Sequence, residues 1–141
     1  MDSFIPVSFV SPRALIILDS YEWLGTPYLF GGDSKTGIDC SHFVYEVFHK
    51  RMPTYAYLWT TQYPDSPRFK QVPAPAAADL IYWEPPAGDP SGHIGIVIDP
   101  EAGTFIGAQT STGVAVANYI TNTYWEGRLR RRYLRFKELV L

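Results

Sequence analysis

Apolar residues recur at helical spacing in two stretches of the first third of the chain. The first stretch begins at Ser11-Pro12, a typical helix start with proline at an early helical position, and stops before Gly25. Its apolar stripe consists of Ala14, Leu15, Ile17, Leu18, Tyr21 and Leu24. The second stretch follows Cys40 and ends near Lys50, and its apolar face consists of Phe43, Val44, Val47 and Phe48. The pattern therefore predicts two amphipathic helices.

The second half of the chain contains short runs rich in β-branched and aromatic residues, which are typical of strands. Five such runs lie at about 79–83, 93–98, 104–109, 113–119 and 130–136. Helices first and strands afterwards indicate the α+β class, with the helices packed on one face of a roughly five-stranded antiparallel sheet. With 141 residues, the chain (1–141) has the length of a single domain with a real core.

A segment rich in proline and aromatic residues, 52–78, separates the second helix from the first of these strands. A long irregular connection of this kind often has a function. Its aromatic side chains either wall a substrate groove or pack over the core, and we expect packing for most of them. Another turn-rich loop, 84–91, lies directly before the strand at 93–98.

Composition narrows the class of protein. A hydrophobic fraction of 46% with 16% aromatic residues is typical of a folded globular chain. The net charge of -2 gives no support for nucleic-acid binding. No run approaches the ~20 apolar residues of a transmembrane helix, and residues 1–10 lack the basic region of a signal peptide. A single cysteine excludes an internal disulfide framework, and without clustered cysteine and histidine ligands we expect no metal and no cofactor.

Cys40, the only cysteine, stands where a glycine-rich loop turns into the second helix. The free N–H groups and the macrodipole of a helix N-terminus stabilise an anion, so a thiol there is expected to lose its proton more easily. The thiolate is the nucleophilic form of cysteine. The alternative is a small buried apolar residue, which is the usual role of a lone cysteine. Catalysis by Cys40 therefore requires a neighbouring base.

His93 is the predicted base. It opens a β-branched strand directly after Gly92, which gives its ring access to a neighbour. His42 lies two residues after Cys40, so its side chain is expected to point elsewhere on the helix. His49 lies near the end of that helix, which is a favourable place for a solvated cation. Catalysis needs a group that takes the proton of the thiol and returns one to the leaving amine, and we assign this role to His93.

Three blocks of residues resemble the NlpC/P60 family of papain-like cysteine peptidases, which cut peptidoglycan stem peptides. The blocks are Gly25-Thr26-Pro27-Tyr28 with Gly31-Gly32 and Gly37-Ile38-Asp39-Cys40-Ser41, then Ala78-Asp79-Leu80-Ile81-Tyr82-Trp83, and finally Gly92-His93-Ile94-Gly95-Ile96-Val97. The resemblance extends over about residues 12–136, and the first and third blocks at this separation are its specific signal. It implies a papain-like fold, a peptidoglycan stem peptide as the partner, and cleavage between D-glutamate and the diamino acid.

The resemblance also implies roles for residues around the cysteine. Tyr28, Asp39 and Ser41 match family positions that contact the substrate. The Tyr28 hydroxyl is also a candidate oxyanion donor, as is the backbone N–H of Cys40. Asp39 is in addition a suitable N-cap for the helix. His42 is a departure, because the family generally has a glycine at this position.

The third catalytic residue departs further from the family pattern. The family normally carries a polar side chain, often histidine, on the strand after the base, and this position corresponds to Gly107. Gln109 shares the strand face of Gly107, because side chains two residues apart point the same way. Its amide carbonyl would accept an N–H from His93 and fix the tautomer, so Gln109 is the predicted third catalytic residue. The alternative is that Gln109 merely satisfies a strand end.

The segment 105–114 resembles NlpC/P60 domains fused to polymorphic or Rhs-type bacterial toxins. We therefore expect an antibacterial effector that acts in the periplasm or after secretion, exported by a specialised secretion system, with an immunity protein as its inhibitor. A basic run consists of Arg128, Arg130, Arg131, Arg132 and Arg135. It is most simply the solvated face of the last strand, and the alternative is a contact with an acidic partner such as the immunity protein or teichoic acid.

Two other functions remain open from the sequence. The same fold class hosts acyltransferases and deamidases, in which the thiolate would process a different acyl group. The second is a decayed, non-catalytic domain that only binds the cell wall. Retention of Cys40 and His93 argues against decay, whereas a glycine at position 107 argues for it.

Overall fold

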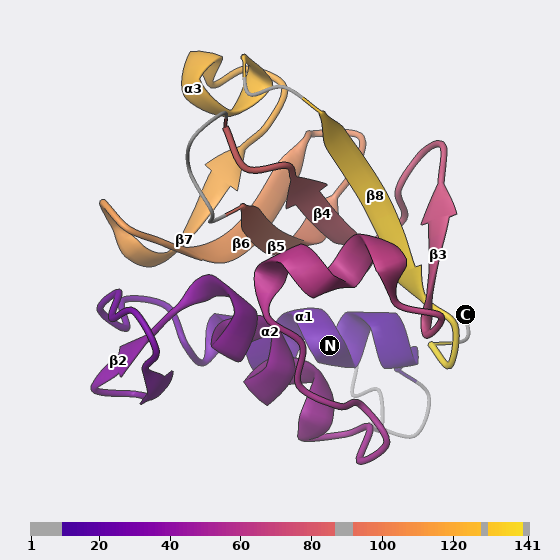
Figure 1. Cartoon of the computed structure of the whole chain (residues 1–141), viewed down its shortest axis with the longest axis horizontal. Helices are drawn as coiled ribbons and strands as arrows, with labels where there is room; N and C mark the ends of the chain where they lie inside the picture. The colour runs from indigo at the N-terminus through magenta and orange to yellow at the C-terminus, as the bar shows by residue number, and fades with distance from the viewer. Residues whose placement is uncertain (1–9, 87–91, 128–129, 140–141) are drawn as a thin grey trace, which may run out of the picture.

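The computed structural model of the chain describes residues 10–86, 92–127 and 130–139. Helices and a six-stranded antiparallel sheet form two layers (Figure 1). Helix α2 (Cys40–His49) packs on the sheet, and helix α1 (Pro12–Tyr21) packs on α2. The predicted α+β class is therefore confirmed.

The sheet has the strand order β3-β8-β4-β5-β6-β7, and all neighbouring strands are antiparallel. Its strands are β3 (Phe69–Val72), β4 (Leu80–Trp83), β5 (His93–Asp99), β6 (Thr104–Gln109), β7 (Gly113–Asn118) and β8 (Arg131–Phe136). The smaller elements are the hairpin of β1 (Asp33–Ser34) and β2 (Gly37–Ile38), the 3-10 helix η2 (Thr60–Asp65) and helix α3 (Thr123–Glu126). Helix α2 contacts β5 and β6, the strands that carry His93 and Gln109.

All five predicted strands are present, each within one residue of its predicted ends. Strand β3 contradicts the prediction that 52–78 is irregular throughout. It is a four-residue edge strand whose two middle side chains are exposed, so its sequence carries little hydrophobic periodicity. The first helix ends at Tyr21, before the stop predicted at Gly25. Within the described ranges, no helix is long and apolar enough to cross a bilayer.

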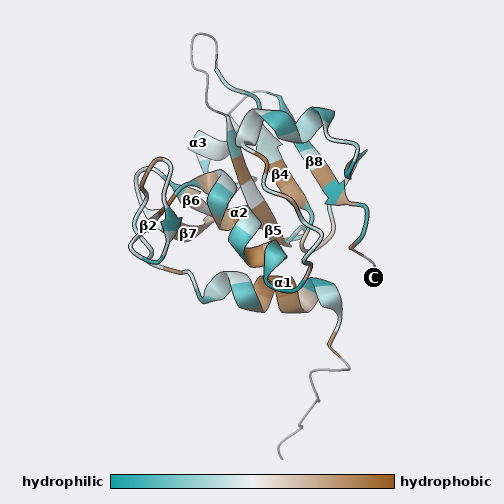
Figure 2. Cartoon of the chain, turned by 60° about the horizontal axis from the view of Figure 1, so that its bottom comes forward, coloured by the Kyte–Doolittle hydropathy of each residue, from teal (hydrophilic) through white to brown (hydrophobic). Residues whose placement is uncertain are grey.

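A hydrophobic cluster covers each face of the sheet. The cluster beneath the helices includes Ile38, Phe43, Val47, Phe48, Ile94, Ile96 and Ile106. The opposite cluster consists of Ile81, Trp83, Val97, Phe105, Tyr119 and Trp125. Figure 2 shows hydrophobic segments on the central strands β4 and β5 and on the middle of α1. Successive side chains of β4 and β5 enter opposite clusters. Both strands, including β5 with His93, are therefore buried on both faces.

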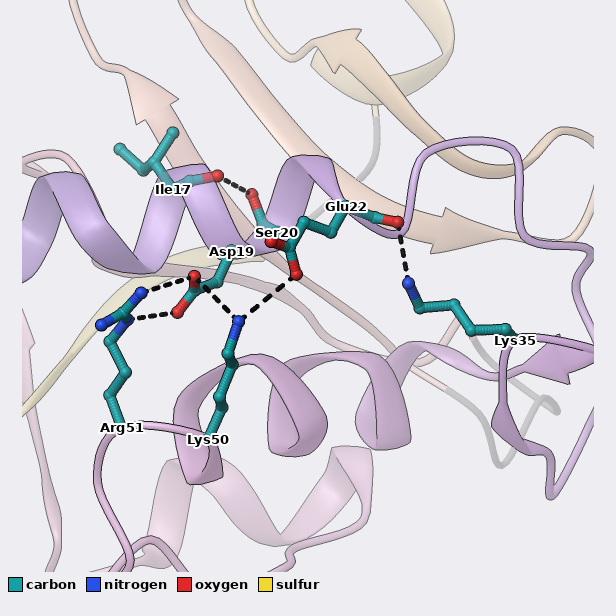
Figure 3. A network of polar contacts seen from close by, with 7 residues as sticks. All are labelled: Ile17, Asp19, Ser20, Glu22, Lys35, Lys50 and Arg51. Carbon is teal, nitrogen blue, oxygen red and sulfur yellow. Dashed lines mark hydrogen bonds and ion pairs between the residues drawn. The ribbon is translucent and has the colours of Figure 1, made fainter.

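A polar network joins α1 to the end of α2 (Figure 3). Asp19 accepts hydrogen bonds from Arg51 Nη2 at 3.0 Å and Lys50 Nζ at 3.4 Å. Lys50 Nζ also lies 3.3 Å from Glu22 Oε2. Burial opposes ionisation of Asp19, but the two cations outweigh it and lower the pKa of this carboxyl. The network therefore holds the helix that begins at Cys40 against α1.

Asp79 is a fully buried carboxylate directly before β4. Arg13 Nη1 donates to its Oδ1 at 3.0 Å, and Arg135 donates from Nε and Nη2 at 2.9 and 2.8 Å. The backbone N–H of Ala76 adds a bond of 2.7 Å. Burial disfavours the charge, but these hydrogen bonds outweigh it and lower the pKa of Asp79. Asp79 thus ties α1 to β4 and β8.

Three arginines of the predicted basic run are half-exposed, and each also has a partner within the molecule. The partners are Asp79 for Arg135, Glu84 for Arg132 (Nη2 to Oε1, 2.6 Å) and the ring of Tyr119 for Arg131 (5.1 Å). Arg130 is exposed. Arg128, residues 87–91 of the predicted loop and residues 1–9 of the N-terminus lie outside the described residues.

We predict that Asp79→Asn lowers the free energy of unfolding by about 3 to 5 kcal/mol at neutral pH, because it leaves Arg13 buried without its counter-charge. The pKa of Asp79 is lowered in the folded state, so its contribution is present above the ordinary aspartate pKa of about 3.9 and is lost as the pH falls through the folded value. The difference between the variant and the parent protein should therefore shrink in acid. Urea unfolding at neutral pH and at about pH 3 measures it.

Asp33→Asn is the matched control, because Asp33 is exposed and the substitution removes the same charge. It should change the free energy of unfolding by less than about 0.5 kcal/mol at either pH. An Asp79→Asn variant as stable as Asp33→Asn at neutral pH would contradict the structural role of this ion pair.

Candidate active site

The glycine-rich loop and the start of α2 are joined through Asp39, which is the N-cap of the helix. Its Oδ1 accepts the N–H of His42 at 2.9 Å, and its Oδ2 accepts the N–H of Gly31 at 2.9 Å. Gly31 has a φ of 76°, a conformation that glycine adopts without strain. The predicted capping role of Asp39 is therefore confirmed, and it fixes Cys40 as the first residue of the helix.

The Cys40 thiol is buried at this helix start. Thr60 Oγ1 lies 3.3 Å from Sγ, and backbone hydrogen bonds from Ile94 and Ser41 also reach the sulfur. Burial raises the pKa of the Cys40 thiol, and these hydrogen bonds offset the effect only in part. The expectation that the helix N-terminus lowers this pKa is therefore wrong, because desolvation of the thiolate outweighs the helix. A thiol in this environment needs a base.

His93 and Gln109 lie side by side on the neighbouring strands β5 and β6. His93 is the first residue of β5 and Gln109 is the last residue of β6. His93 Nε2 lies 3.2 Å from Gln109 Oε1, and Gln109 Nε2 donates to the Ala115 carbonyl at 3.1 Å. The bond to Ala115 fixes which end of the amide faces His93. An amide oxygen only accepts, so His93 Nε2 carries a proton and Nδ1 is the acceptor of the neutral ring.

Gly107 leaves the space in which this hydrogen bond forms. A Cβ at position 107 would lie 2.5 Å from Gln109 Oε1 and 3.4 Å from His93 Nε2. Any side chain there would therefore displace the Gln109 amide. Gly107 and Gln109 are alternate residues of β6, and the glycine lets the side chain of Gln109 occupy the space beside His93.

One cavity of about 1090 Å³ is lined by all six predicted site residues. These are Tyr28, Asp39, Cys40, Ser41, His93 and Gln109. The charges of Cys40 and Asp39, together with burial as the largest cause, raise the pKa of Tyr28. Tyr28 therefore lies close enough to Cys40 for a charge on the sulfur to affect the ionisation of the Tyr28 hydroxyl. Among the described residues, no group of three or more histidine, cysteine or acidic side chains could hold a metal ion.

Asp39 and Ser41 belong to a polar network on one wall of this cavity. Ser41 Oγ donates to Asp39 Oδ1 at 3.2 Å and lies 2.8 Å from the Tyr57 hydroxyl. His42 Nδ1 lies 2.8 Å from the same Asp39 oxygen, and its ring stacks on Tyr57 with centroids 4.3 Å apart. The ring of His42, which we expected to point away from Cys40, is held by Asp39 and Tyr57 on this wall of the cavity. His49, in contrast, is exposed as predicted.

The sequence did not identify several residues that line the site. Thr60 and Trp125 carry no motif, and helix α3 with Trp125 is too short for a periodic signal. The aromatic residues of 52–78 divide between the two expected roles. Tyr55 and Tyr63 pack in the core with their hydroxyl oxygens 2.5 Å apart, and Tyr57 and Trp59 line the cavity. The proline-aromatic composition of this segment was the available signal for Tyr57 and Trp59.

Comparison with known proteins identifies relatives over most of the chain. A "Probable endopeptidase" of Haemophilus influenzae is 30% identical over 112 residues, which cover 79% of this chain and 68% of the relative. The "Murein DD-endopeptidase MepS/Murein LD-carboxypeptidase" of Escherichia coli K12 is 31% identical over 113 residues, and the chain spans 57% of its length. The "Probable peptidoglycan endopeptidase LytE" of Bacillus subtilis is 31% identical, and the chain spans 31% of its length.

Solved structures share the fold. The NlpC/p60 domain of the peptidoglycan hydrolase SagA superposes with a TM-score of 0.65 at 27% identity, covering 86% of this chain and 97% of that domain. An NlpC/P60 family protein from Bacillus cereus gives a TM-score of 0.71 at 20% identity, covering 90% of this chain and 41% of that protein. The model of the NlpC/P60 family matches residues 25–133. The family and the peptidase class predicted from the sequence are confirmed, and the chain belongs to the NlpC/P60 family.

Proposed function

We propose that the chain is a cysteine endopeptidase that hydrolyses the stem peptides of peptidoglycan. The observation that carries the proposal is the convergence, in one cavity, of a helix-capped thiol and a histidine whose Nε2 is held by an amide oxygen. In the neutral ring held this way, Nδ1 is the nitrogen that would accept the thiol proton. The printed names of the relatives, which include murein and peptidoglycan endopeptidases, support the substrate class.

The reaction begins when the proton of Cys40 Sγ passes to His93 Nδ1. The thiolate then attacks the carbonyl carbon of the scissile amide and forms a tetrahedral oxyanion. The backbone N–H of Cys40 and the Tyr28 hydroxyl are the donors that stabilise this oxyanion. Collapse breaks the C–N bond, and His93 gives its proton to the leaving amine. Water, deprotonated by His93, then hydrolyses the thioester and restores the thiol.

Gln109 keeps the His93 ring in the tautomer and orientation that proton transfer requires throughout this cycle. By accepting the Nε2–H, it holds the neutral tautomer in which Nδ1 is basic, and it continues to accept from the imidazolium. Asp39 and Ser41 present polar atoms on the cavity wall beside the nucleophile, and we assign them with Tyr28 to substrate binding.

The proposed bond lies between D-glutamate and the diamino acid of the stem peptide. The name of the Escherichia coli relative specifies other bonds of the same polymer, so the fragments released by the enzyme decide between them. Action in the periplasm or outside the cell follows from this substrate.

The antibacterial effector role, its secretion route and an immunity protein remain predictions from the segment 105–114. Expression directed to the periplasm of a susceptible cell, with and without Cys40→Ala, tests for toxicity.

We predict that the protein releases defined stem-peptide fragments from purified peptidoglycan and that Cys40→Ala and His93→Ala abolish the release. Without the thiol no acyl-enzyme forms, and without the imidazole the buried thiol keeps its proton. Mass spectrometry of the soluble fragments identifies the bond.

His49→Ala is the matched control, because His49 is exposed near the end of α2 and is not among the residues lining the cavity. It should retain parental activity. Absence of any cysteine-dependent fragment, on cell walls of several chemotypes, would reject the hydrolase. The search would then move to acyl transfer, deamidation of protein glutamines or cell-wall binding without catalysis.

We predict that Gln109→Ala lowers kcat by about 10²-fold with little change in KM, because a misoriented base costs rate rather than binding. Gln109→Glu keeps an acceptor oxygen at the same reach and should retain much more of the activity. Steady-state kinetics on a purified muropeptide measure both variants. Equal kcat for the parent protein and Gln109→Ala would limit Gln109 to satisfying a strand end.

We predict that Gly107→Ala displaces the Gln109 amide and disrupts its bond to His93, because the new Cβ would fall 2.5 Å from Oε1. Nitrogen-15 NMR of the histidine ring should show a loss of the Nε2–H tautomer at neutral pH. In the double variant with Gln109→Ala the clash is gone. Gly107→Ala should therefore cost less stability in that background, but the tautomer should not recover. An unchanged NMR signature in the single variant would contradict the role of Gly107.

A further inference from the structure

Three aromatic rings surround the imidazole of His93. The Trp125 ring stacks on it, with centroids 5.0 Å apart and an interplanar angle of 30°. The Trp83 ring lies tilted at 5.8 Å, and Phe105 presents an edge contact at 6.3 Å. His93 is 7% exposed and Trp125 is 8% exposed, so water has little access to either ring. The base therefore lies within an aromatic enclosure formed by Trp83, Phe105 and Trp125.

Trp125 is held in this position by its own contacts. It lies on α3, whose N-cap Asn122 accepts the N–H of Tyr124 at 3.0 Å. The Trp125 ring packs on Trp83 at 4.8 Å and meets Phe105 edge-on at 5.2 Å. Because Trp83 and Phe105 belong to strands β4 and β6, the sheet fixes the plane of the Trp125 ring and, through it, one face of the imidazole.

The enclosure matters because His93 must become a cation during the proposed reaction. Burial disfavours a cation, and the rings in contact with the imidazole carry no charge. Among the described residues, the other titratable groups that line the same cavity are Tyr28, Asp39, Cys40, His42, Tyr57 and Tyr124. An aromatic face attracts a cation through its quadrupole, and tryptophan does so most strongly. A stacked indole can therefore offset part of the cost of forming the imidazolium.

We propose that Trp125 is a positioning residue for His93, whose π face orients the imidazole and favours its protonated form in the Cys40–His93 pair. The inference rests on the proposed function for the existence of that pair. Gln109 fixes the ring through one edge, and Trp125 fixes it through one face. Together the two contacts determine both the position of Nδ1 and its readiness to take the thiol proton.

Alkylation of Cys40 by iodoacetamide tests the inference without a cell-wall substrate. The reagent reacts with the thiolate, and Cys40 is the only cysteine, so mass spectrometry of the intact protein gives the rate. The rate is measured as a function of pH for the parent protein, Trp125→Phe and Trp125→Leu. The leucine variant keeps apolar volume but has no π face, whereas the phenylalanine variant keeps a ring.

We expect Trp125→Leu to lower the alkylation rate near neutral pH by about 3- to 30-fold, which is the range of a cation–π contact. Trp125→Phe should restore most of the rate. At the alkaline end of the profile, above the raised pKa of the Cys40 thiol, the thiol ionises without a base and all three proteins should converge. Equal alkylation rates at this pH would show that the substitutions leave the access of iodoacetamide to Cys40 unchanged. On a muropeptide, kcat should fall with the neutral-pH alkylation rate while KM stays constant.

Tyr119→Leu is the control for loss of a ring elsewhere in this cluster, because Tyr119 is buried in it and meets Phe105 at 6.4 Å. This substitution also removes the contact of Arg131 with the Tyr119 ring. This variant should have a lower free energy of unfolding, but the pH dependence of its Cys40 alkylation rate should match that of the parent protein. Leucine and phenylalanine variants with the parental profile would overturn the role of Trp125. If His93→Ala also kept the parental profile, the Cys40–His93 pair itself, and with it the proposed function, would fail.

Discussion

Burial of the Cys40 thiol is the constraint to which the rest of the site responds. A sulfur enclosed at the start of α2 gains fixed geometry, but desolvation raises its pKa and keeps it protonated. The hydrogen bonds of Thr60, Ile94 and Ser41 lower the pKa but do not reverse this effect. In the proposed mechanism, nucleophilicity therefore comes from proton transfer to His93, so the rate depends on how well that ring is held. A buried thiol is also protected from unproductive reaction until a base and a substrate are in place.

Two side chains from different elements of the fold hold the ring of His93, the proposed base. Gln109 approaches an edge of the His93 ring from β6, and Trp125 approaches a face from α3. Each is secured by its own neighbours, Gln109 by the Ala115 carbonyl and Trp125 by the aromatic cluster. A ring held at one edge and one face has little freedom to rotate. This is the geometry that a general base requires, because small misplacements of a catalytic group cost large factors in rate.

Elements with strong local patterns could be predicted, whereas those defined by tertiary contacts could not. The helix after Cys40 has a clear hydrophobic period, and the strand from His93 is a β-branched run. The alternation of side chains along any strand was enough to place Gln109 on the face of Gly107. Strand β3 lacked such a period, because an edge strand of four residues buries only its ends. The stacking of Trp125 depends on how α3 returns over the sheet, which no local pattern encodes. The raised pKa of the thiol was likewise missed, because burial is a property of the packed molecule.

In the proposed mechanism, Gln109 takes the place of the third catalytic residue expected at position 107, and Gly107 leaves room for its side chain. Residues two apart on β6 point to the same face, so a long side chain at 109 can reach the space that a side chain at 107 would fill. This arrangement requires both a glycine at 107 and a long polar side chain at 109. A Cβ at 107 would displace the Gln109 amide, and a short residue at 109 would leave the His93 ring without this acceptor. A glycine at the expected third position is thus consistent with an active enzyme. The absence of a polar residue there argues for decay only when nothing two residues away can take its place.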